Sequence, residues 1–138
     1  MHVAAIQMVS TAQLSDNLQQ AQTLLEQAAQ AGAELAVLPE YFCLIGQRDS
    51  DKLAIQEPFG SGPMQDFLAA TARRLGLWIV AGTLPLTADQ KDRVFNSSLA
   101  YNPQGECVAR YDKIHLFRFD NGTESYDESR VLERGHTP

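Results

Sequence analysis

The glutamate at position 40 is the first residue of this sequence that could carry chemistry. Glu40 follows the apolar run 35–38 and Pro39, a pattern that predicts a buried strand ended by proline. Open α/β sheets place their functional sites just past the carboxyl ends of such strands. The aromatic neighbours Tyr41 and Phe42 would desolvate the carboxylate and strengthen it as a general base. The alternative is a solvated loop glutamate without a chemical role.

A lysine and a second glutamate follow nearer the end of the chain. Lys113 lies among aromatic and aliphatic residues in the segment 110–117, where its charge could stabilise a developing oxyanion. Glu128 ends the acidic stretch 120–128. Each also has a simpler interpretation. Lys113 could be an exposed strand-end lysine beside Asp112, and Glu128 could belong to a solvated loop.

The two cysteines are candidates for a nucleophile. Cys43 lies three residues after Glu40 and could pair with one of the three histidines, His2, His115 or His136. The alternative is small apolar packing, which is expected still more strongly for Cys107 because it lies in a predicted hairpin strand. Two cysteines cannot build a structural zinc site by themselves, and the histidines show no ligand spacing. The sequence therefore predicts no metal site.

Composition and charge restrict the class of protein. The 138 residues can form one domain, and 44% apolar with 20% charged residues is ordinary for a soluble chain. A net charge of −6 argues against binding to nucleic acid or to an anionic membrane surface. The apolar runs are too short to span a bilayer, and the N-terminus lacks the features of a signal peptide. We therefore expect a cytoplasmic protein with reduced cysteines.

The predicted elements alternate between strands and helices. Strands are expected at residues 3–9, 35–38, 77–83, 94–101 and 106–110. A first helix is expected with Asp16 and Gln19 as a capping box and Gly32 as its stop, and a second from Pro63 to Gly76. Residues 40–60 read as a long loop, and the turn signal 102–105 predicts a hairpin. The pattern favours an α/β fold with a mixed, mostly parallel sheet and two helices on one face, which leaves the other face open.

Several segments, in order, resemble the nitrilase superfamily of carbon–nitrogen hydrolases. Residues 3–8 resemble the opening strand of the family, and residues 33–40 its first catalytic motif. Residues 95–98 with 103–105 resemble the central hairpin, and residues 111–117 the second catalytic motif. The resemblance covers essentially the whole chain. The ordered set of motifs is far more specific than either catalytic motif alone.

The resemblance implies a catalytic role for each candidate residue. Glu40 matches the general base and Lys113 the oxyanion-stabilising lysine, while Glu128 lies where many members carry a supporting glutamate. The family's nucleophilic cysteine should follow a further strand beyond Pro138, and neither cysteine of this chain lies at its place. The implied reaction uses no metal and no cofactor.

The resemblance also implies an architecture and a substrate class. Family members contain two similar halves packed as an αββα sandwich, so residues 1–138 are expected to be the N-terminal half of a carbon–nitrogen hydrolase domain. Residues 113–117 and 126–130 look most like the branch that contains omega-amidases and deaminated-glutathione amidases. That branch implies small amides bearing a carboxylate, hydrolysed by a Glu-Lys-Cys triad through a thioester. A homo-oligomer is expected.

Two rival hypotheses remain open at this point. The chain could be a catalytically dead half-domain that serves only in binding or assembly, which the missing cysteine favours. It could also be a cysteine–histidine thiol enzyme that uses Cys43. Under the favoured hypothesis, residues 1–138 alone are expected to be inactive because they lack the nucleophile.

Overall fold

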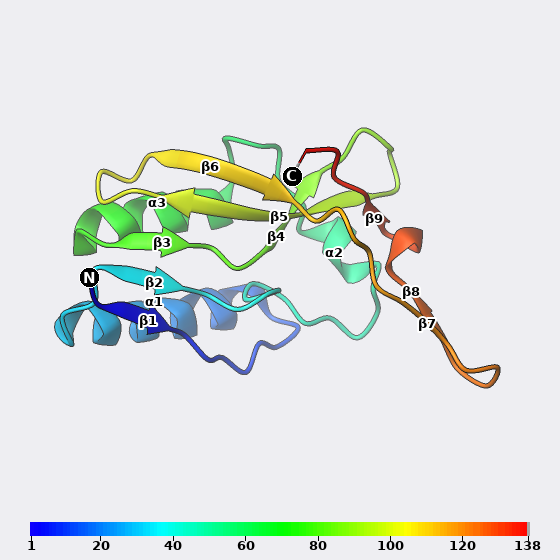
Figure 1. The fold of residues 1–138 in the computed structure, drawn as a ribbon, viewed down its shortest axis with the longest axis horizontal. Coiled ribbons are helices and arrows are strands. Elements are labelled where there is room, and N and C mark those ends of the chain that lie inside the picture. The colour runs from blue at the N-terminus through cyan, green and yellow to red at the C-terminus, as the bar shows by residue number, and fades with distance from the viewer. Residues whose placement is uncertain (138) are drawn as a thin grey trace.

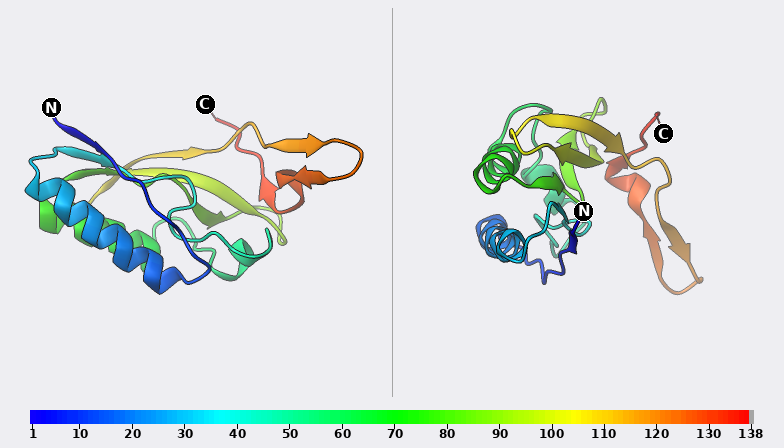
Figure 2. Two further views of the ribbon diagram at one scale, coloured as in Figure 1. Left: turned by 90° about the horizontal axis from the view of Figure 1, so that it is seen from below. Right: turned by 60° about the vertical axis from the view of Figure 1, so that its left-hand side comes forward.

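A mixed β-sheet forms the centre of the fold, with helices on one of its faces (Figure 1). A computed structural model describes residues 1–137 of the chain. The main sheet contains β1 (Val3–Ala5), β2 (Leu35–Val37), β3 (Trp78–Val80), β4 (Leu84–Thr87), β5 (Val94–Tyr101), β6 (Cys107–Asp112) and β9 (Leu132–Glu133). The helices are α1 (Leu14–Gln30), α2 (Asp51–Ala54), α3 (Pro63–Leu75) and the 3-10 helix η1 (Glu128–Arg130). A separate hairpin of β7 (Arg118–Asp120) and β8 (Ser125–Asp127) projects from the body (Figures 1 and 2).

The long strand β5 connects the parts of the sheet. Strands β1, β2 and β3 run parallel in that order, and β3 pairs in the antiparallel sense with the carboxyl end of β5. Strand β4 pairs with the amino-terminal half of β5 along the same edge of β5 as β3, whereas β6 and β9 pair with the opposite edge of β5. The turn 102–105 joins β5 to β6 as predicted. The mixed α/β sheet and its hairpin are therefore confirmed, but the sheet is not mostly parallel, because β5 pairs in the antiparallel sense with β3, β4 and β6.

Helices α1 and α3 cover one face of the sheet, as Figure 2 shows, and this also confirms the prediction. Leu25 of α1 and Leu68 of α3 are fully buried and belong to one core with Ala36 of β2 and Ile79 of β3. Apolar residues repeat at helical spacing in both helices, and this places one continuous stripe against the sheet. The two helices thus fix β2 and β3 and, with them, the residues that follow the ends of these strands.

Some local predictions were wrong. Helix α1 begins at Leu14 without a side-chain cap, so the expected capping box at Asp16 is absent. The Asn17 side chain instead bonds the backbone of Thr11 on the approach to the helix. The first strand ends at Ala5 rather than at residue 9, because the chain leaves the sheet to reach α1. The loop 40–60 contains α2, and β4, β7, β8 and β9 were not anticipated.

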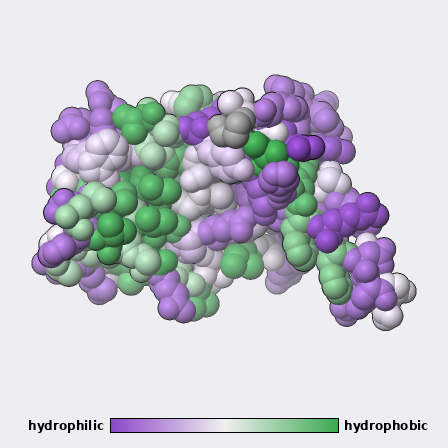
Figure 3. All heavy atoms as spheres, viewed as in Figure 1, coloured by the Kyte–Doolittle hydropathy of each residue, from purple (hydrophilic) through white to green (hydrophobic). Residues whose placement is uncertain are grey.

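The face of the sheet opposite the helices carries exposed apolar side chains. Val3, Leu35 and Trp78 lie side by side in register across β1, β2 and β3. Val3 is 55% exposed and Trp78 42% exposed, whereas Ala36 and Ile79, one position further along, are buried against the helices. Figure 3 shows hydrophobic residues gathered over these strands on this face. We call the surface formed by Val3, Leu35 and Trp78 the open sheet face.

Candidate active site

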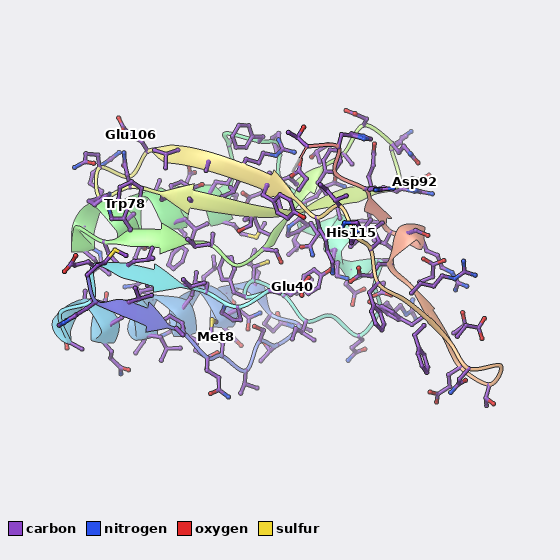
Figure 4. All side chains as sticks on the ribbon, in the orientation of Figure 1. Met8, Glu40, Trp78, Asp92, Glu106 and His115 are labelled. Atoms are coloured by element: carbon purple, nitrogen blue, oxygen red, sulfur yellow. The ribbon has the colours of Figure 1, made fainter. Side chains whose placement is uncertain are left out.

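Three charged side chains from distant parts of the sequence meet beyond the end of β2. The Lys113 Nζ atom lies 3.1 Å from Glu40 Oε1 and 3.0 Å from Glu128 Oε2. Figure 4 shows Glu40 just past β2 and His115 on the segment that follows β6, so these segments approach each other near the middle of the molecule. The structure thus brings together all three residues that the sequence singled out.

Glu40 is held by an unusual turn. The next residue, Tyr41, has a positive φ of 55°, and its N–H donates to Thr83 Oγ1 at 2.9 Å. A Cβ atom at Gly82 would lie 2.0 Å from the Pro39 carbonyl oxygen, so no larger residue fits there. Strained backbone of this kind persists only where surrounding structure imposes it, and it is common at functional sites. The connection from β3 to β4 therefore fixes the position of Glu40.

The carboxylate of Glu40 receives a further hydrogen bond from β5. Asn96 is 1% exposed, and its Nδ2 atom donates to Glu40 Oε1 at 2.8 Å. The Glu40 side chain remains 50% exposed, because Phe42 turns into the core instead of covering it. The expected desolvation by neighbouring aromatic residues is therefore wrong for residues 1–137. The carboxylate is oriented by hydrogen bonds and not by an apolar pocket.

Lys113 is fixed through its backbone at the end of β6. Its N–H donates to the Asn96 carbonyl oxygen at 2.9 Å, and its own carbonyl oxygen accepts from Gly135 N at 3.0 Å. Partial burial by itself would lower the pKa of Lys113, but the hydrogen bonds and charges of Glu128 and Glu40 outweigh it and raise the pKa. Lys113 is therefore a firmly protonated cation at neutral pH. Asp112, the alternative partner, pairs with Arg110 instead.

Glu128 is a buried residue rather than part of a solvated loop. Its side chain is 6% exposed, and its Oε2 atom accepts from the Phe117 N–H at 2.7 Å. The Glu128 N–H in turn donates to the Phe117 carbonyl oxygen at 3.0 Å. These bonds close the base of the hairpin formed by β7 and β8 and aim the carboxylate at Lys113. Glu128 thus positions the lysine.

Comparison with known proteins identifies the family. A family model for "Carbon-nitrogen hydrolase" matches residues 2–138. This chain is a member of the carbon–nitrogen hydrolase family. The nitrilase-superfamily resemblance of the sequence motifs is thereby confirmed.

Relatives of this carbon–nitrogen hydrolase include enzymes named as amidases. A deaminated glutathione amidase of Synechocystis sp. (strain PCC 6803 / GT-S) is 36% identical over 132 residues, which are 94% of this chain and 48% of that protein. The chloroplastic omega-amidase of Arabidopsis thaliana is 30% identical over 141 residues, 99% of this chain and 38% of that protein. The chain therefore spans half or less of the length of these relatives.

Solved structures show the same fold. The C. elegans NitFhit protein superposes with a TM-score of 0.83 at 26% identity, covering 97% of this chain and 33% of that one. Saccharomyces cerevisiae Nit3, described as a member of branch 10 of the nitrilase superfamily, gives a TM-score of 0.81 at 26% identity over 98% of this chain and 48% of its own.

The two cysteines of this carbon–nitrogen hydrolase chain hydrogen-bond through their thiols to backbone carbonyl oxygens, Cys43 to Thr83 and Cys107 to Ala109. Cys43 is fully buried, and burial raises the pKa of its thiol to about 12. A thiol that stays protonated is a poor nucleophile, so the cysteine–histidine hypothesis lacks support. Cys107 is exposed, and its predicted packing is wrong because β6 contributes a solvent-facing edge of the sheet.

Sequence reasoning missed the role of Asn96. The polar run Asn96-Ser97-Ser98 inside a buried strand was the available signal, because buried polar groups require partners. Asn96 Oδ1 and the Tyr41 hydroxyl are buried without a hydrogen-bond partner among residues 1–137. Within the same residues, no cluster of histidine, cysteine or acidic side chains could hold a metal ion, and no helix is long and apolar enough to cross a membrane.

Proposed function

We propose that residues 1–138 are the N-terminal half of an amidase domain that releases ammonia from small amides bearing a carboxylate. The observation that carries the proposal is the contact of Lys113 with both Glu40 and Glu128. The relatives named as deaminated glutathione amidase and omega-amidase support the substrate class. In this proposal a second half, outside residues 1–138, contributes the nucleophilic cysteine. The protein acts as a homo-oligomer in the cytoplasm, without nucleic acid or membrane as a partner.

The two oxygens of Glu40 have different tasks in the proposed reaction. Asn96 and Lys113 both bind Oε1, which leaves Oε2 to accept the proton of the cysteine thiol. The thiolate attacks the amide carbonyl carbon, and the protonated Glu40 then gives its proton to the departing nitrogen, which leaves as ammonia. Water, deprotonated by Glu40, hydrolyses the thioester, releases the carboxylic acid and returns the thiol.

Lys113 stabilises the negative charge that forms on the carbonyl oxygen during both additions. An ammonium group has three N–H donors, and Glu40 and Glu128 occupy two of them. The third donor and the fixed positive charge remain for the oxyanion. Because the two carboxylates hold the lysine in place before substrate binds, the ammonium group needs little reorientation when the oxyanion forms.

The proposal is tested by restoring the missing half. Residues 1–138 alone should release no ammonia from succinamate, since removal of a covalent nucleophile costs several orders of magnitude in rate. A chimera that joins them to the portion of the Synechocystis relative that follows its matched residues should be active. Ammonia release is measured for both proteins. Turnover by residues 1–138 that is lost on alkylation of Cys43 would contradict the proposal and revive the thiol hypothesis.

The open sheet face favours a second function, in assembly. Soluble monomers rarely expose contiguous apolar patches larger than a few hundred Å², and burial of such surface contributes about 25 cal/mol per Å². We expect residues 1–138 to form a two-fold dimer, sheet against sheet, because a self-complementary interface closes most simply. Sedimentation equilibrium over a dilution series measures this association.

Two variants locate the interface of the expected dimer. Trp78→Lys should weaken the dimer, whereas Phe119→Lys on the projecting hairpin should not, although these aromatic residues are 42% and 45% exposed. A compact species of 15.2 kDa at every concentration would show that the open sheet face does not drive assembly.

A further inference from the structure

A small cavity adjoins Tyr41, the residue that follows Glu40. It has a volume of about 170 Å³, and its walls include Tyr41, Arg48, Asp49, Lys52 and Tyr126. We call it the Lys52 pocket. Pockets that hold a whole drug-sized ligand measure roughly 300–1,000 Å³, so this one suits a single group of a small molecule.

Lys52 is the unusual residue of this pocket. Its side chain is only 9% exposed, yet Nζ has one long contact, 3.4 Å to Asp49 Oδ1, and otherwise lies 4.3 Å from the centre of the Tyr41 ring. An ammonium group carries three donors, and buried donors are normally paired. A cation–π contact attracts the charge but accepts no directed hydrogen bond from a second N–H. Lys52 therefore retains donor capacity at the wall of a cavity.

The unused donors of Lys52 favour an anionic group in the pocket. Arg48 adds a second positive charge, and the wall carries the carboxylate of Asp49, whose Oδ1 atom contacts Lys52 and accepts a hydrogen bond from the Tyr126 hydroxyl at 3.0 Å. The Asp51 carboxylate lies beside the pocket and accepts from the Arg48 backbone N–H at 3.0 Å. A carboxylate, with several acceptor positions, matches the free donors of Lys52 and the size of the pocket.

The pocket is joined to the proposed catalytic residues through consecutive backbone. Glu40 and Tyr41 follow one another, and burial together with the nearby charges of Glu128 and Glu40 raises the pKa of Tyr41, so the wall of the pocket lies close to both carboxylates. Tyr126 connects the opposite wall to the hairpin whose base Glu128 closes, and its ring lies 5.8 Å from that of Phe117. A short molecule held in the pocket by one end would present its other end to Glu40 and Lys113.

We propose that the Lys52 pocket binds the carboxylate of the amide substrate and that Lys52 determines the preference for charged over neutral amides. This inference rests on the amidase function proposed above and adds the residue that selects the substrate. Lys52 lies outside the Glu40–Lys113–Glu128 contacts, so its effect is on substrate affinity and not on the chemical step.

The test compares two probes that differ in one charge. Succinamate carries an amide and a carboxylate, and succinamide replaces the carboxylate by a second neutral amide. Binding to residues 1–138 is followed by amide chemical shifts in nuclear magnetic resonance. Succinamate should bind more tightly than succinamide and shift the signals of residues 46–52. Lys52→Met should lower the affinity for succinamate about 10- to 100-fold, the equivalent of one charge-assisted hydrogen bond, and leave succinamide unchanged.

Matched variants keep the result interpretable. Lys91→Met removes an exposed lysine from the loop between β4 and β5 and should leave the affinity for succinamate unchanged. Arg48→Gln changes an exposed residue and should weaken succinamate binding less than Lys52→Met does. If Lys52→Met does not fold, the wild-type preference for succinamate, the shifts at residues 46–52 and the Arg48→Gln effect decide the question.

Several results would overturn the inference. These are equal affinities for the two probes, unchanged succinamate binding in folded Lys52→Met, or shifts confined to the separate cleft that contains Arg93 and Arg134.

Because binding needs no nucleophile, this test is independent of catalysis. If the chimera is inactive but succinamate binding still depends on Lys52, the amidase proposal is refuted and the Lys52 pocket stands. In an active chimera, Lys52→Met should raise the KM for succinamate with little change in kcat, and an unchanged KM would refute the pocket alone.

Discussion

Glu40→Gln should nearly abolish ammonia release in the chimera with the Synechocystis relative while leaving the fold intact. Glutamine keeps the shape of the side chain and can still accept the Asn96 hydrogen bond through its amide oxygen. It cannot take up a proton, so neither the thiol nor the hydrolytic water would be activated. General base catalysis typically contributes about 10²- to 10⁴-fold, and the loss should reach at least this size in kcat.

A second glutamate serves as the matched control for this variant. Glu34 precedes β2 and Glu40 follows it, and Glu34 is exposed with only a 4.0 Å contact to the N-terminal ammonium group. Glu34→Gln should therefore retain the full rate. Circular dichroism and thermal unfolding of both variants establish that the fold persists. A wild-type rate for Glu40→Gln would remove Glu40 as the general base.

Lys113→Ala should lower kcat in the same chimera about 10²- to 10³-fold, the usual effect of removing an oxyanion-stabilising group. The structure adds a second consequence, because Glu128 loses its cationic partner while its side chain is 6% exposed. An unpaired buried carboxylate should lower the free energy of unfolding by about 1–3 kcal/mol. The variant is therefore expected to be less stable as well as inactive.

A double variant separates the two consequences. Lys113→Ala with Glu128→Gln removes both charges of this ion pair and should recover stability without recovering activity. Glu128→Gln alone should reduce the rate less than Lys113→Ala does, since Glu128 positions the lysine and does not contact the reacting atoms. Denaturant unfolding and ammonia release are measured side by side. Full activity in the double variant would contradict the oxyanion role of Lys113.

The pH dependence of the lysine follows from the direction of its pKa shift. Glu128 and Glu40 raise the pKa of Lys113 above its ordinary value of 10.5. A raised folded-state pKa means that the stabilisation is fully present at lower pH and is lost only as the pH rises through that folded value. Lys113 therefore stays protonated at neutral pH, where its deprotonation contributes to no loss of activity or stability.

The catalytic candidates could be found from the sequence because each lies beside a strong local signal. Glu40 follows an apolar strand ended by proline, and Lys113 follows the second strand of a hairpin marked by the turn 102–105. Their motifs in order were enough to name the family. Single-residue reasoning alone left each of them open, because an isolated charge is more often solvated.

The features that the sequence did not predict are the burial of Lys52 and of Glu128, which depends on contacts formed only in the folded chain. Lys52 lay in an expected loop, and its burial requires the ring of Tyr41 above it. Glu128 lay in an acidic stretch that reads as solvated, and it is buried only because the Phe117 backbone and Lys113 satisfy its oxygens. No local pattern of apolar residues predicts such pairing, since the sequence around a charged residue does not show whether folding brings a partner close to it.

The sequence by itself predicted the alternation of strands and helices and the placement of both helices on one face of the sheet, from apolar periodicity and from proline and glycine at element ends. The order of the family's motifs along the chain singled out the three charged residues. The tertiary structure alone decided that Asn96 binds Glu40, that one lysine bridges two carboxylates, and that Glu40 stays half exposed. The reason is physical: hydrogen bonds and burial depend on atoms brought within a few ångströms by folding, across separations such as the 73 residues between Glu40 and Lys113.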